Sequence, residues 1–170
     1  MKVLFREQQR FKQVWLWVVI LGVAAMSWAG FIYKVILGGD LGSRSASAIQ
    51  LAVMAGLLGV GLPLFFYSMK LTTKVYPGLL TVQFSPFHLK AMKIPLHELR
   101  NYESVTYNPI LDYGGWGIRW SFNGKAYNTS GNKGVQLYFY NKKPLLIGSQ
   151  RPQQLLEAIR KAKEIKRTDV

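Results

Sequence analysis

The sequence contains no cysteine, only two histidines and few acidic residues. The absence of cysteine excludes a disulfide scaffold, a zinc site with thiolate ligands, an iron–sulfur cluster and a cysteine nucleophile. Eight Asp and Glu residues stand against 22 Lys and Arg residues, which gives a formal net charge of +14 over 170 residues. Such an excess of positive charge predicts an anionic neighbour.

Two long stretches, residues 14–33 and 49–69, lack any charged residue. A helix rises 1.5 Å per residue, so roughly 20 apolar residues cross the hydrocarbon core of a bilayer. We therefore predict a transmembrane hairpin over residues 14–69, with spans at about 14–33 and 49–69 and an external loop at 34–48. A cleaved signal peptide is the alternative for the first stretch, but its apolar run is longer than such peptides have.

Basic residues flank the spans unevenly. Residues 1–13 and the region after the second span are richer in Lys and Arg than the loop between the spans. Because Lys and Arg are retained on the cytoplasmic side, we predict that both termini are cytoplasmic. The candidates to face anionic lipid headgroups are the cations Lys2, Arg6, Arg10, Lys12, Lys70 and Lys74.

Small residues recur at helical spacing in both spans, which lets two helix backbones approach closely. This pattern predicts either closure of the hairpin or an interface between copies of the chain. The candidate helix-packing residues are Ala25 and Ala29 in the first span and Ala48, Ala52, Ala55, Gly56 and Gly59 in the second.

Beyond residue 70 the hydrophobic pattern changes to alternation, which is typical of half-buried strands. The Asn123-Gly124 pair is a strong hairpin signal between two such strands. Leu155, Ile159 and Ala162 then follow at helical spacing after Pro152. We predict an α+β fold, in which a meander of antiparallel strands forms a β-sandwich or barrel over residues 71–165, capped by a C-terminal amphipathic helix. Residues 166–170 form a basic tail.

Several sequence stretches in this region resemble a family of bacterial membrane proteins in which a transmembrane hairpin precedes a pleckstrin-homology-like (PH-like) domain. The resemblance implies a PH-like domain at residues 71–165 and a location in the bacterial cytoplasmic (inner) membrane, but no biochemical activity. The stretches are Lys93–Leu99, Tyr113–Arg119, Ala126–Asn128, Ser130-Gly131, Gly134-Val135 and Leu146–Pro152.

No pattern of residues predicts catalysis, a metal or a cofactor. His88 and His97 lack metal-ligand spacing, and the glycine-rich segments lack the spacing of phosphate-binding loops. One segment has the features of a recognition loop, since three glycines surround a tryptophan next to a cation; packing of Trp116 beneath the sheet is the alternative. The candidate interaction residues are Asp112, Gly114, Gly115, Trp116, Gly117, Arg119 and Lys133.

These observations favour a non-enzymatic membrane adaptor or accessory subunit. Its expected partner is another membrane protein or further copies of the chain. A sensor of anionic lipids is the alternative, because each Lys or Arg near an anionic leaflet adds about 1 kcal/mol of attraction. Nucleic-acid binding ranks below both, because the membrane already accounts for the positive charge.

Overall fold

The structure is a computed structural model that describes residues 2–39, 47–122 and 124–168, and the chain forms two compact units. The helical unit comprises Lys12–Ser68, and the sheet unit combines Met1–Phe11 with Met69–Val170. Part of the predicted external loop (40–46), Asn123 of the predicted turn and residues 169–170 of the basic tail lie outside the described residues.

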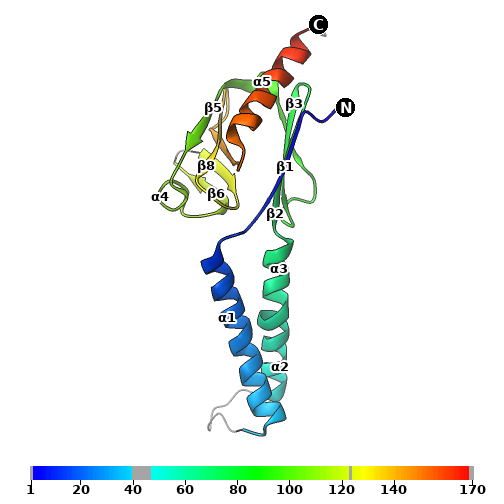
Figure 1. Cartoon of the computed structure of the whole chain (residues 1–170), viewed down its shortest axis with the longest axis vertical. Helices are drawn as coiled ribbons and strands as arrows, with labels where there is room; N and C mark the ends of the chain where they lie inside the picture. The colour runs from blue at the N-terminus through cyan, green and yellow to red at the C-terminus, as the bar shows by residue number, and fades with distance from the viewer. Residues whose placement is uncertain (1, 40–46, 123, 169–170) are drawn as a thin grey trace. The chain divides into compact units, whose positions relative to one another are not determined.

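The helical unit consists of two apolar helices, each of which includes a π-helical turn (Figure 1). The first is α1 (Val14–Phe31) with η1 (Ile32–Ile36), and the second is α2 (Ala48–Gly56), η2 (Leu57–Gly61) and α3 (Leu62–Ser68). A capping box at Ser47 and Gln50 starts α2. Val14–Ile36 and Ala48–Ser68 are each long and apolar enough to cross a membrane, which confirms the prediction of two apolar helices.

The first sheet has the strand order β1-β2-β3-β4, with every pair antiparallel. Its strands are β1 (Phe5–Arg10), β2 (Lys70–Tyr76), β3 (Leu79–Ser85) and β4 (Met92–Pro95). The sequence pattern predicts that residues 1–13 lie outside the sheet domain, whereas Phe5–Arg10 forms its first strand. Alternating burial identifies this strand, but two of its inward residues are Glu7 and Gln9, so the hydrophobic pattern does not reveal it.

Those polar residues tie β1 to the segment before the C-terminal helix. The carboxyl group of Glu7, which is 5% exposed, accepts hydrogen bonds from the Ser149 hydroxyl at 2.6 Å and the Gln150 N–H at 2.9 Å. The Gln9 side-chain amide donates to the Gly148 carbonyl oxygen at 2.7 Å. Buried polar groups require such partners. The contacts therefore join residues more than a hundred positions apart in the sequence.

The second sheet is open and has the order β5-β8-β9-β7-β6. Its strands are β5 (Leu99–Thr106), β6 (Gly117–Ser121), β7 (Gly124–Asn128), β8 (Lys133–Phe139) and β9 (Leu145–Gly148). The pairing of β7 with β9 is parallel, so the predicted antiparallel meander is wrong at this point. Within the part of the chain that the structure describes, the two sheets also do not close into a barrel, because each ends in two edge strands. The architecture is thus α+β with two sheets and a C-terminal helix.

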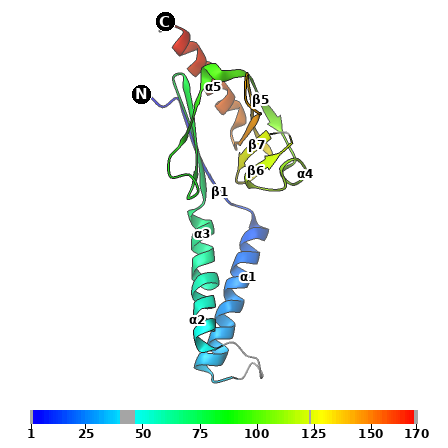
Figure 2. The ribbon, with the colours of Figure 1, turned by 180° about the vertical axis from the view of Figure 1, so that it is seen from behind.

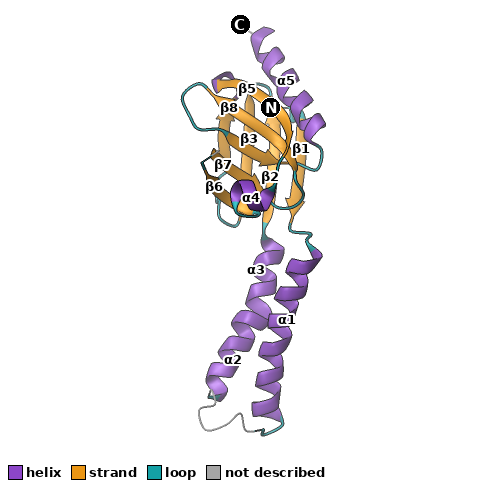
Figure 3. Ribbon diagram, turned by 90° about the vertical axis from the view of Figure 1, so that its left-hand side faces the viewer, coloured by secondary structure: helices purple, strands orange, loops and turns teal. Residues whose placement is uncertain are grey.

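Helix α5 (Pro152–Thr168) packs against strands of both sheets (Figures 2 and 3). Leu155, Ile159 and Ala162 are completely buried in the core shared by the sheets. Full burial of a large aliphatic side chain contributes about 1.5–3 kcal/mol, so the amphipathic stripe of this helix is a major part of the core. The short helices η3 (Leu96–Glu98) and α4 (Pro109–Tyr113) connect the remaining strands.

Candidate functional site

A row of cations crosses the outer face of the first sheet. The register places Arg6 opposite Lys74, Lys74 opposite Thr81, and Thr81 opposite Lys93. Residues directly opposite each other in a sheet lie on the same face with Cβ atoms about 4.5–5.5 Å apart, and like charges in that position repel. Arg6 and Lys74 are such a pair, so this face favours an anionic neighbour that would relieve the repulsion.

A second pair of cations on the same face consists of Arg10 and Lys70. The only acidic residue in β1–β4 is Glu7, and it points to the inside. We call the surface formed by Arg6, Arg10, Lys70, Lys74 and Lys93 the basic face. It contains four of the six cations predicted to face lipid, while Lys2 and Lys12 are exposed outside the strands.

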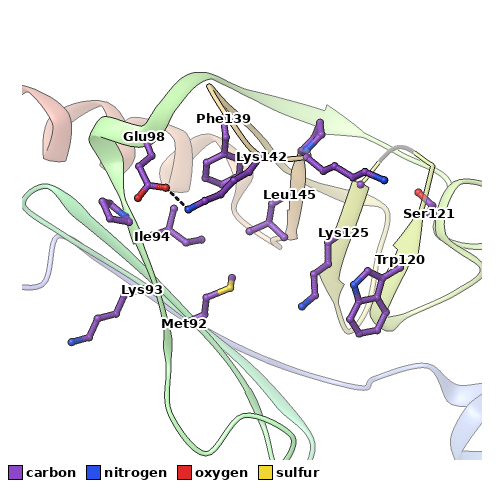
Figure 4. Close-up of a pocket in the computed structure, with 14 residues that line it drawn as sticks. Met92, Lys93, Ile94, Glu98, Trp120, Ser121, Lys125, Phe139, Lys142 and Leu145 are labelled. Carbon is purple, nitrogen blue, oxygen red and sulfur yellow. Dashed lines mark hydrogen bonds and ion pairs between the residues drawn. The ribbon is translucent and has the colours of Figure 1, made fainter.

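The other prominent surface is a groove of about 520 Å³ between β4 and the far ends of β6–β9, which we call the open-edge groove. Figure 4 shows apolar side chains in the middle of the groove, with Lys125 and Trp120 on the opposite side from β4. The apolar residues are Met92, Ile94, Phe139 and Leu145.

Two lysines of the groove, Lys142 and Lys125, have different kinds of partner. Lys142 pairs with Glu98 at 2.6 Å. The ammonium group of Lys125 instead lies 4.7 Å from the ring centres of both Trp120 and Tyr127, within the range of cation–π attraction. Sequence patterns do not predict that these residues lie together, because they meet through the parallel β7–β9 pairing and the turns beside it.

The predicted recognition loop is an ordered turn after α4. Asn108 caps α4 by accepting hydrogen bonds from the N–H groups of Ile110 and Leu111, and Gly114 ends it in the left-handed conformation. The Asp112 carboxyl group accepts a hydrogen bond from the Asn108 N–H at 2.7 Å. Asp112 therefore stabilises the helix start through contacts within its own segment.

The loop is also tied to the rest of the second sheet. The half-buried Trp116 indole donates a hydrogen bond to the Gly131 carbonyl oxygen at 2.9 Å, and the Arg119 guanidinium donates to the Trp116 carbonyl oxygen at 2.9 Å. Gly115 and Gly117 have φ of 120° and 116°, which side chains disfavour. Lys133 is exposed at the start of β8. Hydrogen bonding and backbone geometry thus account for this glycine-rich segment.

A buried polar network lies beneath this loop. Asn128 is fully buried; its side-chain oxygen accepts from the Gly117 N–H at 2.9 Å and its amide donates to the Tyr107 hydroxyl at 3.1 Å. Burial raises the pKa of Tyr107 to about 12, against a smaller opposing effect of the hydrogen bond from Asn128. Tyr107 therefore stays neutral at physiological pH and acts as a structural hydrogen-bond partner.

The predicted small-residue packing is found only in part within the helical unit. Ala55 is 2% exposed, and Gly59 lies so close to the Trp28 indole that a Cβ atom there would be 2.5 Å from the Trp28 Nε1. Ala24, rather than Ala25 or Ala29, is the buried alanine of α1. The remaining predicted residues, Ala48, Ala52 and Gly56, are exposed in the single chain, so they do not close the hairpin.

His88 lies near one of the rings that hold Lys125. Its imidazole ring meets Tyr127 edge-on, with 5.4 Å between the ring centres. Burial, and secondarily the positive charge of Lys125, lower the pKa of His88 below 6.5. The charge of Lys125 thus contributes to the low pKa of His88, but less than burial does.

Comparison with known proteins identifies a family but no activity. No curated protein matches the chain. A sequence family described as a family of unknown function matches residues 1–164. This match covers β1, both apolar helices, both sheets and most of α5. The chain therefore belongs to the family of unknown function DUF6141.

Proposed function

We propose that this protein is a non-enzymatic adaptor or accessory subunit, anchored in a membrane by Val14–Ile36 and Ala48–Ser68. The observation that carries the anchor is the exposure of these helices: in the most apolar window of each, only 11% and 6% of the residues are buried. A pair of helices in a water-soluble core would bury most of that surface. A hydrocarbon environment satisfies it without further protein.

The pairing of β1 with β2 supports a definite topology for this anchor. The chain leaves the first sheet at Arg10 and re-enters it at Lys70, and these two residues are register partners. Two spans that begin and end beside one sheet must return to the same side of the bilayer. The basic residues of that sheet favour the cytoplasmic side of the bacterial inner membrane.

Because the chain has no cysteine, single cysteines test this topology directly. We expect Leu37→Cys, in the external loop, to react with a membrane-impermeant maleimide in intact cells. Gln8→Cys, on the exposed side of β1, should react only after the cells are opened. Labelling of Gln8→Cys in intact cells, or release of the protein by alkaline carbonate, would refute the anchor or its orientation.

The sheet unit supplies the binding part of the proposed adaptor. Two sheets with a helix packed across both, in a unit whose first strand is followed by the transmembrane hairpin, support a PH-like domain that mediates protein–protein contact or self-assembly. The exposed residues Ala48, Ala52 and Gly56 are compatible with contacts between copies. Purification from native membranes in mild detergent, followed by mass spectrometry and native sizing, tests this role. A monomer without any reproducible companion would contradict it.

Binding of anionic lipid is a second candidate function, favoured by the basic face. Each of its cations would contribute about 1 kcal/mol near an anionic leaflet. Removing Arg6 and Lys74 together should therefore weaken lipid binding by about 2 kcal/mol, or roughly 30-fold. Their close pairing also means that an anion would relieve repulsion between them.

The test compares the full chain in nanodiscs with and without anionic lipid, with amide hydrogen exchange of β1–β4 as the readout. Anionic lipid should slow exchange in the wild-type protein and have little effect on the Arg6→Gln/Lys74→Gln variant. The matched control, Lys142→Gln/Lys143→Gln, removes the same charge from the second sheet. Equal protection of all three proteins would rule out the basic face as the lipid-binding surface.

A further inference from the structure

Two residues at core-facing positions of the second sheet are not part of the core. Trp120 and Lys125 are register partners, and the same face carries Ile118 and Tyr127, which belong to the core cluster. Yet Trp120 is 71% exposed. A tryptophan and a lysine on the inner face of a sandwich would normally be covered by the opposite sheet. Here both residues line the open-edge groove instead.

The ammonium group of Lys125 is a preorganised positive charge without a carboxylate. The rings of Trp120 and Tyr127 hold it from two sides at 4.7 Å each. Among the described residues, no ion pair to Lys125 is formed, and Glu98, the acidic residue of the groove, is already paired with Lys142. A fixed cation beside an apolar wall attracts an anion more strongly than a freely solvated one does.

The apolar wall is large enough to hold the body of a ligand. Ile94 and Leu145 are 5% and 6% exposed and form its base, while Met92 and Phe139 are half-buried at its sides. Figure 4 shows these four side chains directed toward one another, and shows Lys93 pointing away from them. A volume of about 520 Å³ lies within the range of small-molecule sites, roughly 300–1,000 Å³.

Strand β4, at the edge of the first sheet, favours a small ligand over an extended peptide as the occupant of the groove. A peptide would add to β4 through its backbone, but β4 has four residues and includes Lys93 and Pro95. Short edge strands with lysine and proline are the pattern that prevents strand addition. We infer that the open-edge groove binds a small amphipathic anion, with its apolar body on Ile94 and Leu145 and its carboxylate or phosphate group on Lys125.

This inference does not rest on the adaptor role, and water-soluble probes test it. We would titrate the full chain in neutral nanodiscs with hexyl phosphate, with inorganic phosphate and hexanol as separate comparisons and empty nanodiscs as the blank. Hexyl phosphate should bind at least about tenfold more tightly than either comparison, since only it supplies both the charge and the apolar body.

Two charge-matched variants locate the site. Lys125→Met should weaken hexyl phosphate binding by about tenfold or more, and Lys125→Arg should retain most of it. Lys161→Met removes the same charge from the exposed side of α5, outside the groove, and should leave binding unchanged. Equal losses in Lys161→Met and Lys125→Met would overturn the site, as would hexyl phosphate binding to the wild-type protein no more tightly than inorganic phosphate.

A second readout leaves the groove residues unchanged. Because Lys125 contributes to the low pKa of His88, an anion on Lys125 should raise that pKa toward 6.5. NMR titration of His88, with His97→Gln used to assign the signals, detects this change. An unchanged pKa of His88 at saturating hexyl phosphate would place the anion elsewhere and refute the inference.

Discussion

Replacement of Glu7 by alanine should loosen the N-terminal strand selectively. In the native protein the Glu7 carboxyl group accepts hydrogen bonds from the Ser149 hydroxyl and the Gln150 N–H. The substitution leaves both donors without that acceptor at a site where Glu7 is 5% exposed. A buried donor left unpaired costs about 1–3 kcal/mol. The Ser149 hydroxyl is buried and the Gln150 N–H, which is only partly buried, adds about 1 kcal/mol, so we expect the opening free energy of β1 to fall by about 2–4 kcal/mol.

Amide hydrogen exchange of the full chain measures this effect strand by strand. A loss of about 2–4 kcal/mol corresponds to exchange roughly 30- to 900-fold faster in β1, with little change in β5 and β6. Gln8→Ala is the matched control, because Gln8 is the next residue and faces outward. If β1 exchanges at the same rate in Glu7→Ala and Gln8→Ala, the buried hydrogen bonds do not hold the strand.

Three further predictions concern the sheet unit. Lys125→Met should raise the pKa of His88 toward 6.5 in an NMR titration. Because the low pKa means that the folded state favours neutral His88, the stability that His88 contributes is lost as pH falls below 6.5, and the loss should be smaller in Lys125→Met. Gly134→Ala should lower the thermal midpoint by an amount equivalent to about 2 kcal/mol or more, because its Cβ would lie 2.5 Å from the Ile147 carbonyl oxygen. The Tyr107 hydroxyl, with its pKa raised to about 12, should remain protonated in an ultraviolet titration to about pH 11; ionisation near pH 10 would contradict its burial.

The helices and most strands follow from periodicity, but the pairing of the strands does not. Long apolar runs identify both helices of the hairpin, and Leu155, Ile159 and Ala162 identify α5. Periodicity does not predict strand β1, because its inward residues Glu7 and Gln9 are polar and form hydrogen bonds to residues far along the chain. Local patterns contain no information about such distant partners.

The same reason limits prediction of the surfaces. The cations Arg6 and Lys74 are visible in the sequence, yet only the register shows that they lie opposite each other. In the sequence Lys125 has the pattern of a lysine in a turn, and only the parallel pairing of β7 with β9 shows that it lies beside Leu145. The glycines around Trp116 form a turn held by hydrogen bonds, and the role of this turn in recognition stays a prediction.

The register of β1 and β2 has a practical consequence for handling the sheet unit. Arg10 and Lys70 face each other as the last pair before the loop of an ordinary β-hairpin, so the two apolar helices are an insertion in a hairpin loop. A fragment beginning at residue 71 would lack β1 and expose the edge of β2 to aggregation. Replacing residues 12–68 with a short Asn-Gly connection would keep β1 and β2 joined, and should give a water-soluble form of the unit for crystallisation.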